Sequence, residues 1–298
     1  TPGSPAPEKS CNPLGRSTLV FSAPVMKEEV KAGLKVTPDL AGGRTDFDPW
    51  ESVYTYSHLE ESHESAEDYE VGLPYYLKAA QAYQLQAAAG SIKDEFGRTL
   101  AADVSAEFRT DHREPKFVNA NRYSVLEKAV DSHLPLFVTN LTQVGMSFEM
   151  LTAAGVQSDQ SHTIDLPKVE DIAFAIPIKV REILGGKSGV ITGEYSATPH
   201  TTVPEYSSSG KFFSQVTPFS VHAKLGHFNS LVWVTSLETG LPVSGATVQI
   251  IVGKLNRFAA HPEILSRGIT DKDGAALLDG TERIDPSLTM LESWNDAE

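Results

Sequence analysis

Short runs in which apolar and polar residues alternate recur along most of the chain. Alternation with a period of two is typical of a β-strand that buries one face. The pattern predicts strands at residues 17–21, 34–37, 83–87 and 104–110, and further strands at 134–139, 147–151, 189–195, 219–224, 231–235 and 246–252. It favours an all-β protein built from tandem Ig/fibronectin-like antiparallel β-sandwiches.

Segments rich in Pro, Gly, Ser or charge separate these runs and predict the domain boundaries. Residues 1–15 cannot form a core and are expected to be a flexible leader. Charge and Pro cluster at 110–115, and Ser, Thr and Pro cluster at 196–209. With about 100 residues per sandwich, the chain is expected to hold three domains, at residues 16–112, 113–214 and 215–298.

Two local patterns predict turns or a short helix. Residues 176–184 read either as a helix or as an extended segment that enters a turn, with Gly185 and Gly186 as the terminator. The segment Asp271–Gly274 is expected to form the hairpin turn between two short strands. Gly97 is expected in a tight turn, because glycine adopts positive φ without steric cost.

Charge changes the picture in one segment. The chain has 25 basic and 39 acidic side chains, a formal net charge of −14, which disfavours nucleic acid and anionic membranes as main partners. Residues 46–70 form an acidic insertion in the first domain without Lys or Arg. Its carboxylates are Asp46, Asp48, Glu51, Glu60, Glu61, Glu64, Glu67, Asp68 and Glu70.

This acidic insertion has two interpretations. Such a segment is usually a solvated loop, and the alternative is a docking surface for a basic partner. The docking hypothesis assigns contacts to Glu60, Glu61 and Glu64, with Trp50 as an aromatic anchor.

The sequence predicts no catalytic, cofactor or metal residue, and hence no enzyme. His58 and His63 are five positions apart and do not share a helix face as zinc-protease histidines do. The Asp271–Gly274 segment lacks the further oxygen ligands of a calcium loop. Cys11 is the single cysteine, so the chain holds no internal disulfide and no zinc–thiolate site. No apolar run reaches the roughly 18 residues of a membrane span.

Three segments near the end of the chain resemble a macroglobulin-like domain of the bacterial α2-macroglobulins: residues 216–224, 231–248 and 268–275. The first domain is similar to the opening domain of that family at 19–25, 36–38, 83–85, 93–100 and 108–110, whereas the second fits by position and at 138–140. The resemblance implies macroglobulin-like sandwiches, with seven strands in the third domain. It places Trp233 in the core and Gly245 and Gly274 in turns.

The resemblance also implies a function. Members of this family are large periplasmic proteins, often anchored to the inner membrane, that trap proteases by bait cleavage and, in many members, through a Cys-x-x-Gln thioester. Cys11 lies in a Ser-Cys-Asn-Pro sequence, so this chain holds no thioester. A framework fragment of a periplasmic protease inhibitor is therefore expected, with proteases, other domains of the parent and an envelope protein as partners. The alternative is a surface stalk or adhesin of bacterial Ig-like modules.

Overall fold

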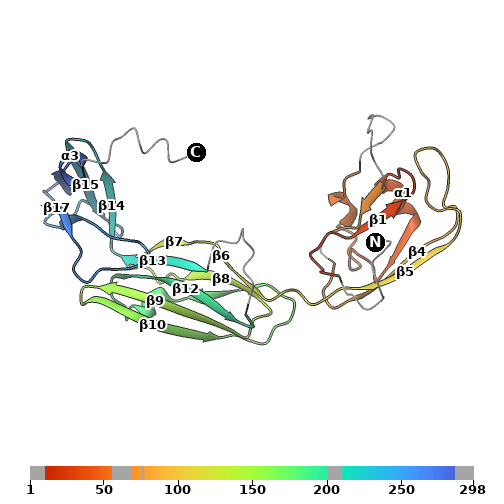
Figure 1. Ribbon diagram of the computed structural model, residues 1–298, viewed down its shortest axis with the longest axis horizontal. Helices are drawn as coiled ribbons and strands as arrows, with labels where there is room; N and C mark the ends of the chain where they lie inside the picture. Colours follow the sequence, from red (N-terminus) through yellow and green to blue (C-terminus); the bar gives the residue numbers. More distant parts are fainter. Residues whose placement is uncertain (1–10, 56–68, 76, 201–209, 286–298) are drawn as a thin grey trace. The chain divides into compact units, whose positions relative to one another are not determined.

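The computed structural model describes residues 11–55, 69–75, 77–200 and 210–285. The chain divides into two compact units, Thr1–Glu114 and Pro115–Glu298. Strands dominate both units, and almost all neighbouring strands run antiparallel (Figure 1). The all-β prediction is confirmed, and every strand predicted from alternation coincides with a strand of the structure.

Two small sheets form the first unit. One pairs β1 (Thr18–Phe21) with β3 (Tyr69–Gly72). The other has the order β2-β4-β5, with the bounds Leu34–Thr37, Ala82–Ala87 and Val104–Arg109. The helix α1 (Lys27–Gly33) and the 3-10 helix η1 (Pro49–Ser52) lie in the connections. Side chains from both sheets and both helices pack into one core around the fully buried Val30.

The second unit begins with a sandwich of two unequal sheets. Their strand orders are β10-β9-β12-β13-β7 and β11-β8-β6. The core contains Val144, Val180 and Ile191, whose side chains are all fully buried. Because five strands face three, the smaller sheet cannot cover the whole inner face of the larger one. In chain order the strands are β6 (Lys116–Asn119), β7 (Tyr123–Glu127), β8 (Leu134–Thr139), β9 (Gln143–Thr152), β10 (Gly155–Asp165), β11 (Phe174–Ile178), β12 (Gly189–Thr198) and β13 (Lys211–Thr217).

The segment 176–184 contains both a strand end and a helical turn. Strand β11 ends at Ile178, and the single-turn helix α2 (Val180–Ile183) follows. Gly185 and Gly186 then have φ angles of 64° and 73°. A residue with a Cβ is strained in this conformation, so the two glycines end the helix as the sequence indicates.

Strand β13 crosses the boundary predicted at residue 215. It pairs with β12 on one side and, in parallel, with β7 on the other, so it is part of the central sandwich. We propose to place this boundary after Thr217. The boundary predicted after residue 112 lies two residues before the division after Glu114.

A smaller sandwich follows, with the sheet orders β14-β15-β18 and β16-β17. The described part of the chain provides these five strands, whereas the resemblance implies seven. Gly245 and Gly274 have φ angles of 77° and 75°, as predicted for glycines in turns. The elements are β14 (Phe219–Lys224), β15 (Asn229–Ser236), β16 (Thr247–Ile251), β17 (Ile264–Ile269), β18 (Ala275–Asp279) and the helix α3 (Thr281–Ile284).

Two predictions for this third sandwich are wrong. The side chain of Trp233 is 42% exposed rather than in the core, and its indole N–H donates to the carbonyl of Asp273 at 3.0 Å. Residues 231–234 are all apolar, so their sequence does not distinguish the inner face from the outer one. The turn Asp271–Gly274 is no hairpin, because β17 pairs with β16 and β18 pairs with β15. It instead carries the chain from one sheet to the other.

Candidate interaction surfaces

The acidic insertion at 46–70 belongs only in part to the described residues. Residues 46–55 and 69–70 are described, whereas Glu60, Glu61 and Glu64 lie outside the described ranges. The hypothesis that these three glutamates dock a basic partner therefore stays a prediction.

Trp50, the expected aromatic anchor, is a core residue of the first unit. It lies in η1 with its side chain 8% exposed, and it belongs to the same buried cluster as Val30 and Val53. The carboxylate of Asp48 accepts a hydrogen bond from the backbone N–H of Trp50 at 3.1 Å and so caps this short helix. A buried indole is not available to a partner, so Trp50 packs the base of the acidic insertion and is not a docking residue.

Basic neighbours compensate two carboxylates at the start of the insertion. Asp46 forms an ion pair with Arg44 at 2.9 Å, and Asp48 forms one with Lys31 at 2.6 Å. The side-chain hydrogen bond from Arg44 lowers the pKa of Asp46, and that from Lys31 lowers the pKa of Asp48. The acidic character available to a partner therefore rests on the carboxylates that come later in the insertion.

The described residues contain no cluster of three or more His, Cys, Asp or Glu side chains suited to a metal ion, and His58 and His63 lie outside them. The carboxylate of Asp271 accepts hydrogen bonds from two backbone N–H groups of its own turn, at 2.9 and 3.0 Å.

Burial raises the pKa of Tyr195, which disfavours the phenolate. None of the described helices is long and apolar enough to cross a membrane.

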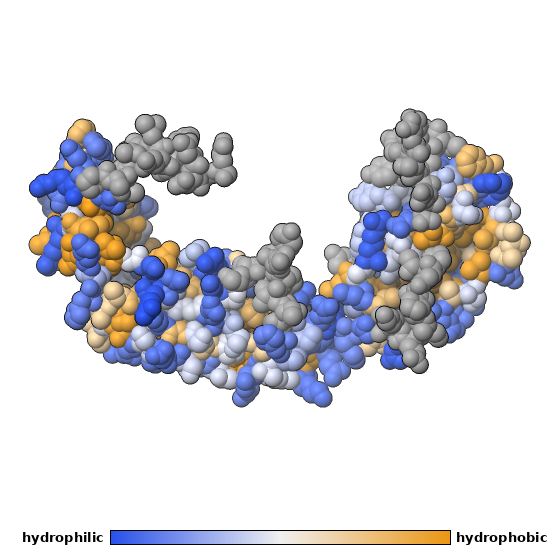
Figure 2. Space-filling view, viewed as in Figure 1, coloured by the Kyte–Doolittle hydropathy of each residue, from blue (hydrophilic) through white to orange (hydrophobic). Residues whose placement is uncertain are grey.

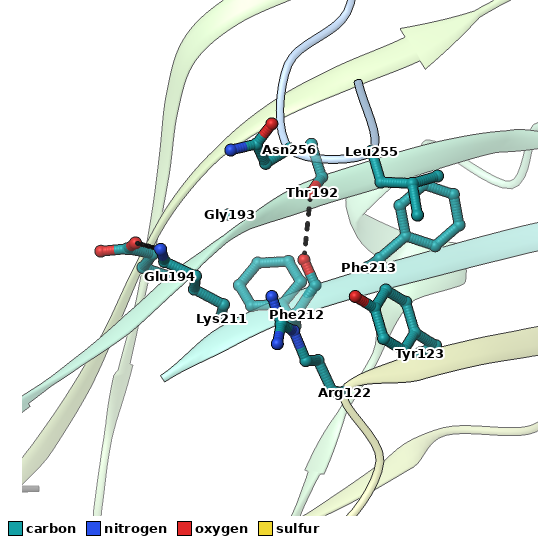
Figure 3. A pocket seen from close by; sticks show the side chains of 10 residues that line it. All are labelled: Arg122, Tyr123, Thr192, Gly193, Glu194, Lys211, Phe212, Phe213, Leu255 and Asn256. Carbon is teal, nitrogen blue, oxygen red and sulfur yellow. Dashed lines mark hydrogen bonds and ion pairs between the residues drawn. The ribbon is translucent and has the colours of Figure 1, made fainter. Parts of the chain in front are cut away.

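A cavity of about 130 Å³ lies where the loop between β16 and β17 meets the central sandwich (Figure 3). Ligand pockets usually measure roughly 300–1,000 Å³, so this cavity is too small for a typical substrate. Close by, the backbone N–H of Phe258 in the same loop donates to Glu149 Oε2 at 2.8 Å. The lining residues are Arg122, Tyr123, Thr192, Gly193, Glu194, Lys211, Phe212, Phe213, Leu255 and Asn256. The cavity and this hydrogen bond mark a joint between the third sandwich and the central one. The sequence did not predict this joint, because the loop between β16 and β17 has no periodic pattern.

A larger open cleft, of about 600 Å³, lies between the edge strands β10 and β11 of the central sandwich. Apolar side chains line much of it, among them Phe148, Ile164 and Ile176, and charged groups such as Asp165 and Lys179 also border it. The β10 edge is interrupted by a register shift between Gln157 and Gln160, and the β11 edge contains Pro177. Bulges and prolines on edge strands oppose pairing with a further strand.

Comparisons with known proteins show which solved structures have a similar fold. No protein-family model and no curated protein matches the sequence. A crystal structure of native alpha-2-macroglobulin from Escherichia coli, spanning domains MG0-NIE-MG1, matches with a TM-score of 0.52 and 17% identity, over 91% of this chain and 87% of that one. The Y1175G mutant of Salmonella alpha-2-macroglobulin matches with a TM-score of 0.57 and 16% identity, over 93% of this chain and 17% of the other.

A third match is Salmonella alpha-2-macroglobulin reacted with methylamine, with a TM-score of 0.57 and 16% identity over 90% of this chain and 16% of the other. This chain thus spans most of the Escherichia coli fragment but about a sixth of the Salmonella structures. At such low identities the likeness shows the fold. The resemblance to bacterial alpha-2-macroglobulins, first seen in three short segments, is confirmed at the level of the fold over more than nine-tenths of the chain.

Proposed function

We propose that this chain is the N-terminal framework of a bacterial alpha-2-macroglobulin-like protein that traps proteases at the cell envelope. The observation that carries the proposal is the match to the MG0-NIE-MG1 fragment, which extends over 91% of this chain and 87% of the fragment. The domain order of that fragment supports a residue-level assignment. Residues 16–112 correspond to MG0, 113–217 to NIE, and 218–298 to MG1.

The proposed role is non-catalytic. A framework protein holds its domains together through packed cores and through contacts between domains. The hydrogen bond from the backbone N–H of Phe258 to the Glu149 carboxylate is such a contact, between the third sandwich and the central one. In the parent protein, proteases and other domains are the proposed partners, and an envelope protein is a further one. The proposed location is the periplasm, with an inner-membrane anchor in the parent, and it rests on the family resemblance in the sequence.

The test uses the full-length gene product, incubated with a broad-specificity protease. Cleavage of a large protein substrate and of a small chromogenic peptide is measured in parallel. A trap that encloses a protease keeps large substrates out while small ones still reach the active site. We expect cleavage of the protein substrate to fall at least tenfold and cleavage of the peptide to stay nearly constant.

The isolated chain 1–298 serves as the control and should change neither reaction. If the full-length product leaves both reactions unchanged, the protease-trap function is wrong. Should the downstream gene then encode further Ig-like repeats and a surface anchor, the stalk or adhesin alternative takes its place.

A further inference from the structure

The smaller sheet of the central sandwich has an apolar outward side. In its strands β6, β8 and β11 every second side chain packs into the core, so the residues between them project outward. Val118 and Phe137 are 44% and 43% exposed. The apolar residues that project outward, here called the apolar face, are Val118, Pro135, Phe137, Ala175 and Pro177.

These side chains form one continuous patch. Phe137 of β8 lies directly opposite Val118 of β6 on one side and Ala175 of β11 on the other, and Pro135 lies opposite Pro177. Directly opposite residues of antiparallel strands have their Cβ atoms about 4.5–5.5 Å apart. The apolar face therefore runs across all three strands, with Phe137 in the middle.

The larger sheet of the same sandwich has a different outward side. An antiparallel sheet that faces water usually alternates apolar residues inward with polar residues outward. Strands β9 and β10 follow this rule, because Ser147 lies opposite Ser161 and Gln143 lies opposite Asp165. Figure 2 accordingly shows mainly hydrophilic or neutral colours over β9 and β10. The apolar face departs from the rule, so the usual solvated side of a sheet does not account for it.

Charge is also scarce on this side of the smaller sheet. The chain has 39 acidic side chains, yet the three strands direct no carboxylate outward, and Lys116 is their one outward charge. The core of a protein–protein interface is depleted in charged residues and enriched in aromatic ones. Composition thus favours an interface at this face.

The edges of the sheet indicate how a partner would bind. Pro177 in the edge strand β11 has no N–H to donate, and the other edge strand, β6, has only four residues. Prolines and short edge strands oppose the addition of a further strand. A partner is therefore expected to pack on the face, as two sheets do when they stack about 10 Å apart.

The small size of the apolar face limits which partner can cover it. From the spacing of strands and residues its area is roughly 250 Å², whereas a stable complex of separate proteins buries about 800 Å² per partner. A second copy of this chain would bind weakly through such an area. A domain on the same polypeptide has an effective concentration of about 1 mM when its linker is short. A small contact is then enough to keep it in place.

We propose that the apolar face packs against the apolar sheet face of another domain of the parent polypeptide, one that follows residue 298. The inference rests on the proposed function only in requiring a longer parent chain. Phe137 and Val118 form the centre of the contact. The central sandwich is then held at a second place in addition to its joint with the third sandwich.

The test measures how fast a cysteine on the face reacts. Val118→Cys, in a Cys11→Ser background, is introduced into chain 1–298 and into the full-length parent, and the labelling rate with N-ethylmaleimide is followed by mass spectrometry of the peptide. We expect labelling in the parent to be at least tenfold slower. Adding Phe137→Asp to the parent should restore the fast rate, because it places a charge in the contact.

Val125→Cys is the matched control. Val125 is 62% exposed in β7 and projects outward from the larger sheet, so it is the same residue type on the other side of the sandwich. It should react equally fast in chain 1–298 and in the parent. The comparison of residues 118 and 125 does not depend on Phe137→Asp and holds even where that variant lowers the unfolding midpoint.

The other outcomes overturn the proposal or the proposed function. Equally fast labelling of Val118→Cys in both lengths overturns this inference. Slow labelling already in chain 1–298 means that this chain or a second copy covers the face, and the inference is then wrong. Equal slowing at Val118→Cys and Val125→Cys in the parent contradicts a contact specific to this face. A parent that slows labelling at residue 118 alone but fails to trap proteases contradicts only the proposed function.

Discussion

Several polar side chains of this protein hold turns together rather than forming a reactive site. The carboxylate of Asp94 accepts hydrogen bonds from the backbone N–H groups of Phe96 and Arg98, at 3.0 and 2.8 Å. Asp271 caps its own turn in the same way. Carboxylates and amides that satisfy backbone groups in turns account for sequence patterns that otherwise resemble binding motifs.

Asn140 shows this at the single-residue level. Its side chain accepts a hydrogen bond from the N–H of Asp171 at 2.6 Å and donates to the Asp171 carboxylate at 3.0 Å, while its own φ is 51°. We expect Asn140→Ala to lower the free energy of unfolding by about 2–4 kcal/mol, from lost hydrogen bonds and backbone strain. Asn140→Gly should cost about 1–2 kcal/mol less, since glycine tolerates this φ. Urea unfolding measures both, and equal losses would contradict the strain argument.

The exposure of Trp233 can be tested by fluorescence. The sequence has three tryptophans, of which Trp50 is 8% exposed and Trp233 is 42% exposed. Trp50→Phe/Trp294→Phe leaves only Trp233, and Trp233→Phe/Trp294→Phe leaves only Trp50. We expect acrylamide to quench Trp233 several-fold more strongly than Trp50. Equal quenching constants would mean that Trp233 is as deeply buried as Trp50 and contradict its exposed position.

The turn held by Asp94 should respond to acid. Burial opposes ionisation of this carboxylate, but hydrogen bonds from the Arg98 side chain and backbone prevail and lower the pKa of Asp94. A folded-state pKa below the unfolded value means that the stabilisation is complete above the unfolded value, near 3.9 for an aspartate. It is lost as the pH falls through the lower folded-state pKa.

NMR titration of this turn provides the measurement. The amide shifts of Phe96 and Arg98 should stay constant from neutral pH to about pH 4 and change only below it. Asp94→Asn should abolish this acid transition. A titration midpoint above the ordinary aspartate value would show that burial outweighs Arg98.

At the scale of elements, alternation located the strands whose two faces differ in polarity. In β4 the buried Tyr83, Leu85 and Ala87 alternate with more exposed residues, and this period is plain in the sequence. Alternation did not reveal β10, an edge strand with mostly exposed polar residues, or α1, in which Val30 is the single buried residue. It could not assign sheets either, because strand partners depend on contacts distant in sequence.

The interaction surfaces were harder to predict than the fold. Trp50 was expected to contribute to docking, yet it packs beneath the acidic insertion because two sheets and two helices meet there. The joint at Phe258 and Glu149 connects residues 109 positions apart through a backbone N–H, which no side-chain pattern encodes. Composition identified the acidic insertion but not its partner.

Two turns of the third sandwich permit a matched pair of glycine substitutions, one at Gly274 between β17 and β18 and one at Gly245 between β15 and β16. Gly274 and Gly245 have nearly equal φ angles of 75° and 77°. A Cβ at Gly274 would lie 2.5 Å from the carbonyl oxygen of Val234, whereas nothing lies within 4 Å of one at Gly245. We expect Gly245→Ala to cost about 1–2 kcal/mol of stability from backbone strain alone, and Gly274→Ala to cost clearly more. Thermal unfolding compares the two, and equal losses would mean that the steric clash relaxes freely.

At the scale of the whole molecule, the charge is unevenly distributed. Net charge governs association and its salt dependence more than it governs fold. The acidic insertion has no Lys or Arg between Asp46 and Glu70, although Arg44 and Lys31 compensate its first two carboxylates. Long-range attraction of a basic partner would therefore depend on the middle of the insertion, where Glu60, Glu61 and Glu64 lie.

Neutralising the carboxylates in the middle of the insertion distinguishes its two interpretations, a solvated loop and a docking surface. The triple variant Glu60→Gln/Glu61→Gln/Glu64→Gln should leave the unfolding midpoint unchanged, because these side chains are expected to be solvated. If the insertion docks, the variant should bind the remaining domains of the parent at least several-fold more weakly, and its affinity should depend less on salt. Surface plasmon resonance at two ionic strengths gives both quantities.

A control with the same loss of charge makes the comparison specific to the insertion. Glu238, Glu263 and Glu282 are exposed in the third sandwich, and their triple Gln variant changes the net charge equally. If docking is local, this control should keep nearly full affinity, because exposed charges outside the contact are largely screened at ordinary salt. Equal weakening in both variants would indicate attraction by net charge alone. Unchanged binding in the insertion variant would end the docking hypothesis and leave residues 46–70 as a solvated loop anchored by Trp50.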